Sequence, residues 1–116
     1  MSVPKNQEEQ TYFFNDYVIK INQKQKEALR FVRITEGRIL NFRLRLISKK
    51  PKSKPSSTRS VVEIEKFTFE EGILHIFYRS GEIQTHYKGE HAEELYKAIS
   101  QAITHEKEKM EKAQLE

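Results

Sequence analysis

The residues best suited to chemistry in this sequence are basic side chains concentrated in the middle of the chain. Between Arg30 and Arg59 there are ten Lys or Arg and one acidic residue, Glu36, so this stretch carries a charge of +9. The other residues hold eleven Lys or Arg against sixteen acids, a charge of −5. Because this distribution makes the molecule electrically two-sided, it predicts an anionic partner. The residues expected to bind that partner are Arg33, Arg38, Arg43, Arg45, Lys49, Lys50, Lys52, Lys54 and Arg59.

The remaining polar residues favour neither a metal site nor catalysis. The absence of cysteine removes disulfides, thiolate nucleophiles and the usual structural zinc sites. Among the four histidines, only His86 and His91 are expected to lie close together, and a metal site needs about three ligands. Asp16 is the only aspartate, and no Gly-x-Ser-x-Gly, Walker or Gly-x-Gly-x-x-Gly pattern occurs. We therefore expect no metal, no cofactor, no catalytic residue and no enzymatic activity.

The second half of the chain, from Val61 to Tyr87, has the alternation of three antiparallel strands. A change of phase predicts a bulge or bend near Glu65-Lys66, and the turns are expected at Glu70-Glu71-Gly72 and at Ser80-Gly81. One side of the last two strands is apolar. That side carries Leu74, Ile76, Tyr78, Ile83, Thr85 and Tyr87.

An amphipathic helix follows these strands. Gly89 can act as its N-cap, and Glu90, Glu93 and Glu94 place negative charge beside its unpaired N–H groups. Apolar residues recur at steps of three and four and predict a stripe that packs on the sheet. The stripe comprises Ala92, Leu95, Tyr96, Ile99, Ala102 and Ile103.

The first half of the chain also reads as strands. Thr11–Asn22 is expected to form a tight hairpin or one kinked strand, and Ala28–Thr35 and Ile39–Ile47 a hairpin that turns at Glu36-Gly37-Arg38. Lys49–Ser60, with two prolines and four lysines, is expected to be a mobile loop without a strand. In the strand Ile39–Ile47, the alternation places Leu40, Phe42, Leu44 and Leu46 on one side and Asn41, Arg43 and Arg45 on the solvent side.

The length of 116 residues predicts a single domain. We expect a flexible N-terminus over residues 1–10, a globular domain over 11–104 with a mobile basic loop at 48–60, and a charged helical extension over 105–116. No apolar run approaches the ~20 residues needed to span a bilayer, and the N-terminus is polar. These features favour a cytoplasmic location.

Two family resemblances accompany this pattern. Residues 17–37, from Tyr-Val-Ile-Lys-Ile-Asn to Arg-Phe-Val-Arg-Ile-Thr-Glu-Gly, resemble the central hairpin of a PUR repeat. That resemblance implies single-stranded nucleic acid as a ligand, with Arg30 and Arg33 in contact. It covers less than a fifth of the chain.

The order of elements resembles a different family over most of the chain. About four strands, a variable loop, three strands and one C-terminal helix is the order of pleckstrin-homology-like domains. The resemblance implies a barrel closed by the helix and a scaffold for proteins, peptides or phosphorylated lipid headgroups, with no cofactor.

Together these observations predict a mainly β fold of about seven antiparallel strands, in a bent sheet or pleckstrin-homology-like barrel capped by a C-terminal helix. The predicted function is a non-catalytic interaction domain that binds an acidic protein segment or an anionic surface through its basic face. The alternative is binding of single-stranded nucleic acid or RNA, because single-strand binders combine arginines with aromatic rings, and Phe31 and Phe42 lie among these arginines.

Overall fold

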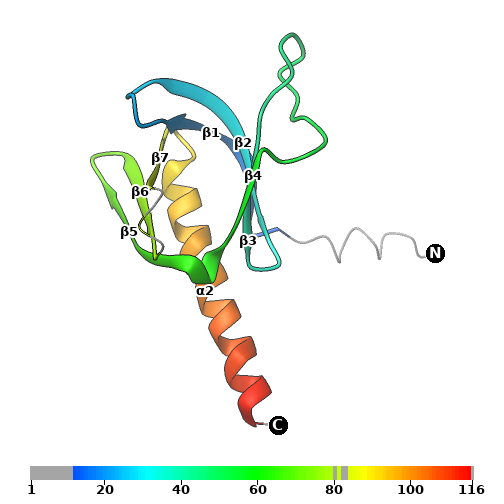
Figure 1. Cartoon of the computed structure of the whole chain (residues 1–116), viewed down its shortest axis with the longest axis vertical. Helices are drawn as coiled ribbons and strands as arrows, with labels where there is room; N and C mark the ends of the chain where they lie inside the picture. Colours follow the sequence, from blue (N-terminus) through cyan, green and yellow to red (C-terminus); the bar gives the residue numbers. More distant parts are fainter. Residues whose placement is uncertain (1–11, 80, 82–83, 116) are drawn as a thin grey trace, which may run out of the picture.

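The computed structural model describes residues 12–79, 81 and 84–115, and seven antiparallel strands within them form one sheet in the order β4-β3-β2-β1-β7-β6-β5. Figure 1 shows this sheet bent around the C-terminal α-helix, so the predicted mainly β fold with a C-terminal helix is confirmed. The elements are β1 (Phe14–Ile21), β2 (Glu27–Thr35), β3 (Arg38–Phe42), β4 (Ser57–Ser60), the 3-10 helix η1 (Val61–Glu63), β5 (Ile64–Glu70), β6 (Ile73–Tyr78), β7 (Gln84–Lys88) and α2 (Ala92–Leu115).

The core lies between the concave face of the sheet and α2. The predicted apolar side of β6 and β7 faces this core, since Leu74, Ile76 and Tyr87 are almost fully buried. The predicted irregularity near Glu65-Lys66 is confirmed, because the β5–β6 register shifts between Ile64 and Lys66. A bulge of this kind increases local twist and helps the sheet to curve around the helix.

Helix α2 buries the stripe that its spacing predicts. Ala92, Leu95, Ile99 and Ala102 have at most 1% of their surface exposed, and the Tyr96 ring packs beside Phe67 and Phe69 of β5. Full burial of one Leu or Ile side chain contributes roughly 1.5–3 kcal/mol, so this stripe is a main source of stability.

Strand β3 differs from the prediction in both length and orientation. It ends at Phe42, not at Ile47, and Ile39 and Asn41 face the core with 0% and 5% of their surface exposed. Phe42 is also buried, but by Phe31 and Arg33 on the outer face. The predicted solvent side was therefore wrong at Asn41, because a buried hydrogen-bond partner outweighs its polarity.

Three further predictions need correction. The first of the two alternatives for Thr11–Asn22, a tight hairpin, is wrong, because β1 is one continuous strand paired with β2 along its whole length. Ser57–Ser60, placed in a loop without strands, pairs with β3 as β4. Val61–Glu63, expected to begin a strand, forms η1. The predicted lead-in of residues 1–10, and Ser80 and Ile83 of the last predicted hairpin, lie outside the described residues.

The segment between β3 and β4 begins with an ordered hairpin, which we call the basic hairpin (residues 43–52). An isolated bridge joins Leu44 to Pro51, and backbone hydrogen bonds of 2.9 Å run from Arg45 N to Lys50 O and from Lys52 N to Arg43 O. Figure 1 shows it rising from one end of the sheet, while the C-terminal part of α2 leaves the domain at the other end.

Candidate anion-binding site

Four cationic side chains lie on the concave face: Lys20, Arg30 and Arg43 line one cavity beside the basic hairpin, and Arg59, on β4 opposite Ile39, is near enough for its charge to act on Lys20. We call this group the basic mouth: Lys20, Arg30, Arg43 and Arg59. In the sheet register, Val18 is opposite Arg30, and Lys20 is opposite Ala28 on one side and Tyr87 on the other. Because Val18 and Tyr87 face the core, Lys20 and Arg30 lie on the same concave side.

The electrostatics of the basic mouth are unfavourable to the protein alone. Burial, followed by the positive charges of Arg30, Arg43 and Arg59, lowers the pKa of Lys20. Among the residues that the structure describes, none of these four cations lies within ion-pair distance of a carboxylate. Like charges gathered without a counter-charge repel one another, and an anionic ligand would relieve that repulsion.

Polar side chains also lie on the concave face, and one of them, Tyr78, contacts Arg59 of the mouth. Tyr87 donates a 2.6 Å hydrogen bond to Asn41 Oδ1, and both residues are buried. The Arg59 guanidinium lies 5.2 Å from the centre of the Tyr78 ring. Burial raises the pKa of Tyr78 to about 12 and also raises the pKa of Tyr87, so both phenols stay neutral at physiological pH. Tyr78 therefore contacts Arg59 without neutralising its charge.

Two shallow cavities adjoin the mouth. The first, of about 250 Å³, has Lys20, Lys26, Arg30 and Arg43 in its wall, together with Glu27, whose carboxylate pairs with Lys88. The second, of about 290 Å³, lies between β2 and the basic hairpin. Its wall consists of Leu29, Arg30, Arg43, Leu44, Arg45, Leu46, Lys49 and Lys52. Cations from three separate parts of the chain therefore border one continuous surface.

The structure brings together only some of the site residues predicted from the sequence. Arg43, Arg45, Lys49 and Lys52 share the second cavity, and Arg59, which lines neither cavity, acts on Lys20 through its charge. Lys50 belongs to the same hairpin and is exposed, and Lys54 is exposed in the segment that follows it.

Arg33 and Arg38 lie elsewhere. Arg33 is on the outer face of β2, where its guanidinium stacks between the Tyr12 and Phe42 rings at 4.8 and 5.0 Å and its Nε donates to Asn15 Oδ1. Arg38 is at the β2–β3 turn, opposite Ser60.

The anion-binding residues predicted from the sequence do not include Lys20 or Arg30. Lys20 lies outside the strongly basic stretch, and Arg30 is named only as a nucleic-acid contact that the PUR-repeat resemblance implies. The alternation of β1 held the missing signal for Lys20, since Phe14 and Val18 at the same parity are buried. A lysine on the inward side of a strand is rarely there for packing alone.

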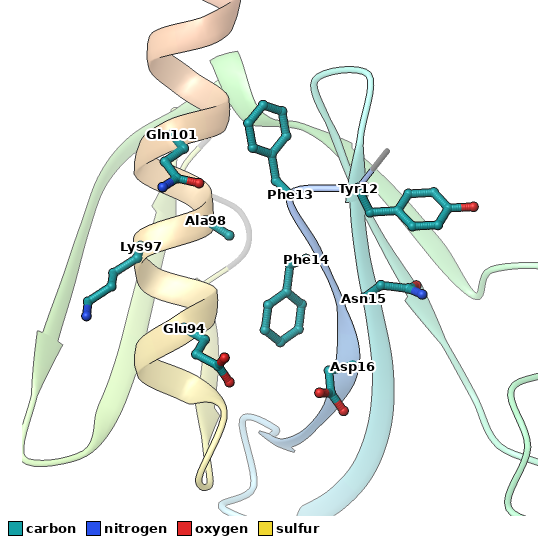
Figure 2. A pocket seen from close by; sticks show the side chains of 9 residues that line it. All are labelled: Tyr12, Phe13, Phe14, Asn15, Asp16, Glu94, Lys97, Ala98 and Gln101. Carbon is teal, nitrogen blue, oxygen red and sulfur yellow. The ribbon is translucent and has the colours of Figure 1, made fainter. Parts of the chain in front are cut away.

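A separate hollow, of about 380 Å³, lies between β1 and α2. Figure 2 shows Phe13 and Phe14 on the helix side of β1 and Glu94 on the side of α2 that faces them, and Lys97 of α2 also lines the hollow. Asp16 adds another acidic group. Because its charges are of both signs, this hollow has no marked preference for an anion.

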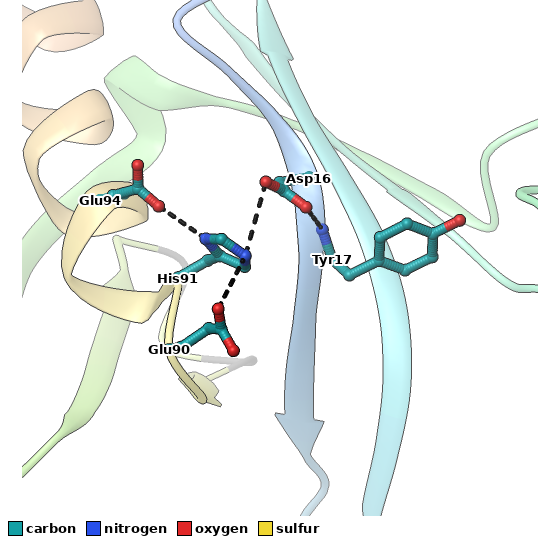
Figure 3. A network of polar contacts seen from close by, with 5 residues as sticks. All are labelled: Asp16, Tyr17, Glu90, His91 and Glu94. Atoms are coloured by element: carbon teal, nitrogen blue, oxygen red, sulfur yellow. Dashed lines mark hydrogen bonds and ion pairs between the residues drawn. The ribbon is translucent and has the colours of Figure 1, made fainter.

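The start of α2 is tied to β1 by His91. Figure 3 shows its ring between three carboxylates: Nδ1 is 2.6 Å from Glu94 Oε1, and Nε2 is 3.6 Å from both Asp16 Oδ2 and Glu90 Oε2. The hydrogen bond to Glu94, then the charge of Asp16, raises the pKa of His91. A protonated imidazole can clamp two elements together, which is a structural role.

The histidine pair expected from the sequence, His86 with His91, is replaced by a different one. His86 lies across the β6–β7 register from His75, with 2.8 Å between their Nδ1 atoms. Burial, then the charge of His75, lowers the pKa of His86. Within the described part of the chain, no three His, Cys, Asp or Glu side chains are grouped so that they could hold a metal ion.

Comparisons with known proteins identify the fold. No family model matches the sequence, and no curated protein matches it. The structure is similar to a solved chain of Vav1, a protein with a pleckstrin-homology domain, described as inhibited by an allosteric inhibitor that blocks its GEF activity; the TM-score is 0.62 at 8% identity. The match covers 80% of this chain and 26% of the Vav1 chain. None of the described helices is long and apolar enough to cross a membrane.

Proposed function

We propose that this pleckstrin-homology-like domain is a non-catalytic interaction module that binds an acidic protein segment or an anionic surface through the basic mouth and the adjoining basic hairpin. The observation that carries the proposal is the convergence of Lys20, Arg30, Arg43 and Arg59 without an acidic partner among the described residues. Fold similarity alone names no ligand. The proposal therefore rests on the site.

The arrangement fits anion recognition better than a role in stability. Structural cations usually pair with carboxylates, as Lys88 does here with Glu27 at 2.6 Å. In contrast, burial and then the charges of Arg30, Arg43 and Arg59 lower the pKa of Lys20, which means that its protonated form is destabilised in the protein alone. Bound phosphate or carboxylate groups would reverse that effect and accept charge-assisted hydrogen bonds from the guanidinium groups.

The outer face is less suited to the alternative, single-stranded nucleic acid. Base stacking needs an open aromatic face, but Phe31 and Phe42 expose only 9% and 4% of their surface. Arg33 already stacks on them and bonds to Asn15. The outer face therefore supports nucleic acid less well than the basic mouth supports an anionic partner.

The test compares two charge-matched variants. Arg30→Gln/Arg43→Gln removes two cations of the mouth, and Lys107→Gln/Lys112→Gln removes two exposed cations from the C-terminal part of α2, at the opposite end of the domain. Binding of tripolyphosphate, an oligoglutamate peptide and single-stranded RNA is measured by calorimetry at several salt concentrations. Each cation near an anionic surface contributes on the order of 1 kcal/mol, so the mouth variant should lose roughly 10- to 30-fold in tripolyphosphate affinity.

The matched control should bind within about twofold of the parent, because exposed charges beyond a Debye length of about 8 Å are largely screened. An equal loss of tripolyphosphate affinity in both variants would show that binding depends only on the net charge of the protein. Parent protein that binds neither tripolyphosphate nor oligoglutamate would refute the proposal. Strong RNA binding that depends on Arg33 but not on Arg30 and Arg43 would favour the alternative.

A further inference from the structure

We propose that the tip of the basic hairpin, Leu46 and Ile47, inserts into the interface of an anionic lipid bilayer while the flanking cations contact the headgroups. This inference rests on the proposed function and names the partner as a membrane surface. It assigns the apolar tip a role that the basic mouth alone does not require.

The exposure of the two tip residues is the first observation. Leu46 and Ile47 expose 88% and 94% of their surface, whereas the other large exposed apolar residues, among those described, expose 43–56%. A single exposed aliphatic residue is ordinary. Two adjacent aliphatic side chains that are almost fully exposed gain no hydrophobic free energy from folding. A partner that removes them from water would supply that free energy.

The second observation is that the tip is held in place. Lys49 N bonds to Arg45 O at 3.1 Å across the tip, and Lys50 N bonds to Ser48 Oγ. The Tyr17 hydroxyl of β1 donates to Lys49 O at 3.1 Å. Because these bonds order the backbone in the free protein, little conformational entropy is lost when the tip binds.

The third observation is the charge around the tip. Arg45, Lys49, Lys50 and Lys52 flank Leu46 and Ile47 along the hairpin, and Arg30 and Arg43 of the mouth lie at its base. Basic residues around a small apolar group are the pattern of interfacial membrane binding, in which the apolar part enters the headgroup boundary by ~5–10 Å. Anionic lipids attract the flanking cations.

The shape of the hairpin favours a bilayer over a protein partner. Figure 1 shows it as a narrow projection at the end of the domain opposite to the C-terminus of α2. A stable protein interface buries about 800 Å² on each partner, and two aliphatic side chains on such a projection supply only a small part of that area. A fluid surface needs no such complementarity.

The first experiment separates the apolar tip from the charges. Leu46→Ser/Ile47→Ser keeps every cation, and Val62→Ser/Met110→Ser is the matched control at two other exposed apolar positions. Sedimentation with phosphatidylcholine vesicles, with and without phosphatidylserine, should show a loss of roughly tenfold or more for the tip variant on the anionic vesicles. The control should sediment as the parent does.

Tripolyphosphate binding distinguishes this inference from the proposed function. Ile47→Ser alone, at a tip residue that lies in the wall of neither cavity, should retain the parent's affinity for tripolyphosphate, because every cation of the mouth and of the basic hairpin is intact. Parent protein that binds tripolyphosphate but not anionic vesicles would overturn only the membrane inference. Parent protein that binds neither would overturn both.

The second experiment measures how deeply the hairpin tip enters the bilayer. The chain has no tryptophan, so Ile47→Trp introduces a single reporter. Anionic vesicles should shift its emission to the blue, and lipids brominated on the upper acyl chain should quench it. Unchanged emission on bound vesicles would show purely electrostatic docking and refute insertion, as would a parent dimer in sedimentation equilibrium that Leu46→Ser/Ile47→Ser dissociates.

Discussion

His91 shows at the scale of one residue how charge links two elements. Its ring joins the start of α2 to Asp16 of β1, and the hydrogen bond to Glu94 is the main cause of its raised pKa. A group with a raised pKa contributes stability that is fully present below its unfolded value of 6.5 and is lost as pH rises through its folded pKa. His86 has the opposite shift and opposes folding as pH falls.

The effect of His91 is isolated by comparing His91→Gln with the parent at each pH. We expect the variant to be less stable below pH 6.5, and the gap to close as pH rises above the folded pKa. Thermal melts across this range measure the gap, and NMR titration should place the pKa of His91 above that of His86. His105→Gln, whose ring contacts Phe13 away from both histidine contacts, serves as a control outside the network. A difference in stability between the two proteins that does not change with pH would show that protonated His91 does not link α2 to β1.

At the scale of an element, α2 is stabilised by its buried stripe. Ile99→Asp should lose roughly 1.5–3 kcal/mol of burial and add the cost of an unpaired buried charge, so the domain should unfold or become severely destabilised. Ser100→Asp introduces the same charge at the adjacent exposed position and should melt close to the parent. A melting temperature of Ile99→Asp equal to that of Ser100→Asp would show that the stripe does not carry the fold.

At the scale of the whole molecule, the two ends of the domain have separate roles. The basic mouth and the basic hairpin lie at one end, and the last part of α2 extends beyond the sheet at the other (Figure 1). Near this second end the helix makes few contacts with the domain. The His105 ring lies 5.7 Å from the Phe13 ring, and a Cβ at Gly37 would lie 2.7 Å from Glu106 Cδ.

Truncation after Thr104 tests this separation. The chain should keep its fold and lose about 1 kcal/mol or less, since the truncation removes only one ring contact, the packing of Glu106 over Gly37 and the Lys109–Glu106 ion pair, each of which contributes little. Urea denaturation measures the loss, and tripolyphosphate binding should not change. A loss of several kcal/mol would show that the helix end is part of the core, and altered anion binding would show that the two ends are coupled.

Local periodicity predicted the elements whose packing follows from their own spacing. The apolar stripe of α2 and the inward side of β6 were correctly predicted, because steps of three or four and of two place side chains on one face whatever their partner. The bulge between Ile64 and Lys66 left a change of phase that can be read in the sequence. For these elements, the sequence by itself determined the structure.

Only the tertiary structure decided the rest. Asn41 faces inward because Tyr87, distant in sequence, supplies its hydrogen bond, and Ser57–Ser60 is a strand because β3 offers it an unpaired edge. The cations of the mouth come from β1, β2, the start of the basic hairpin and β4, and their proximity follows from strand register and the bend of the sheet. The sequence shows how many cations the chain carries, but the pairing of strands that are distant in sequence decides which of those cations lie close together.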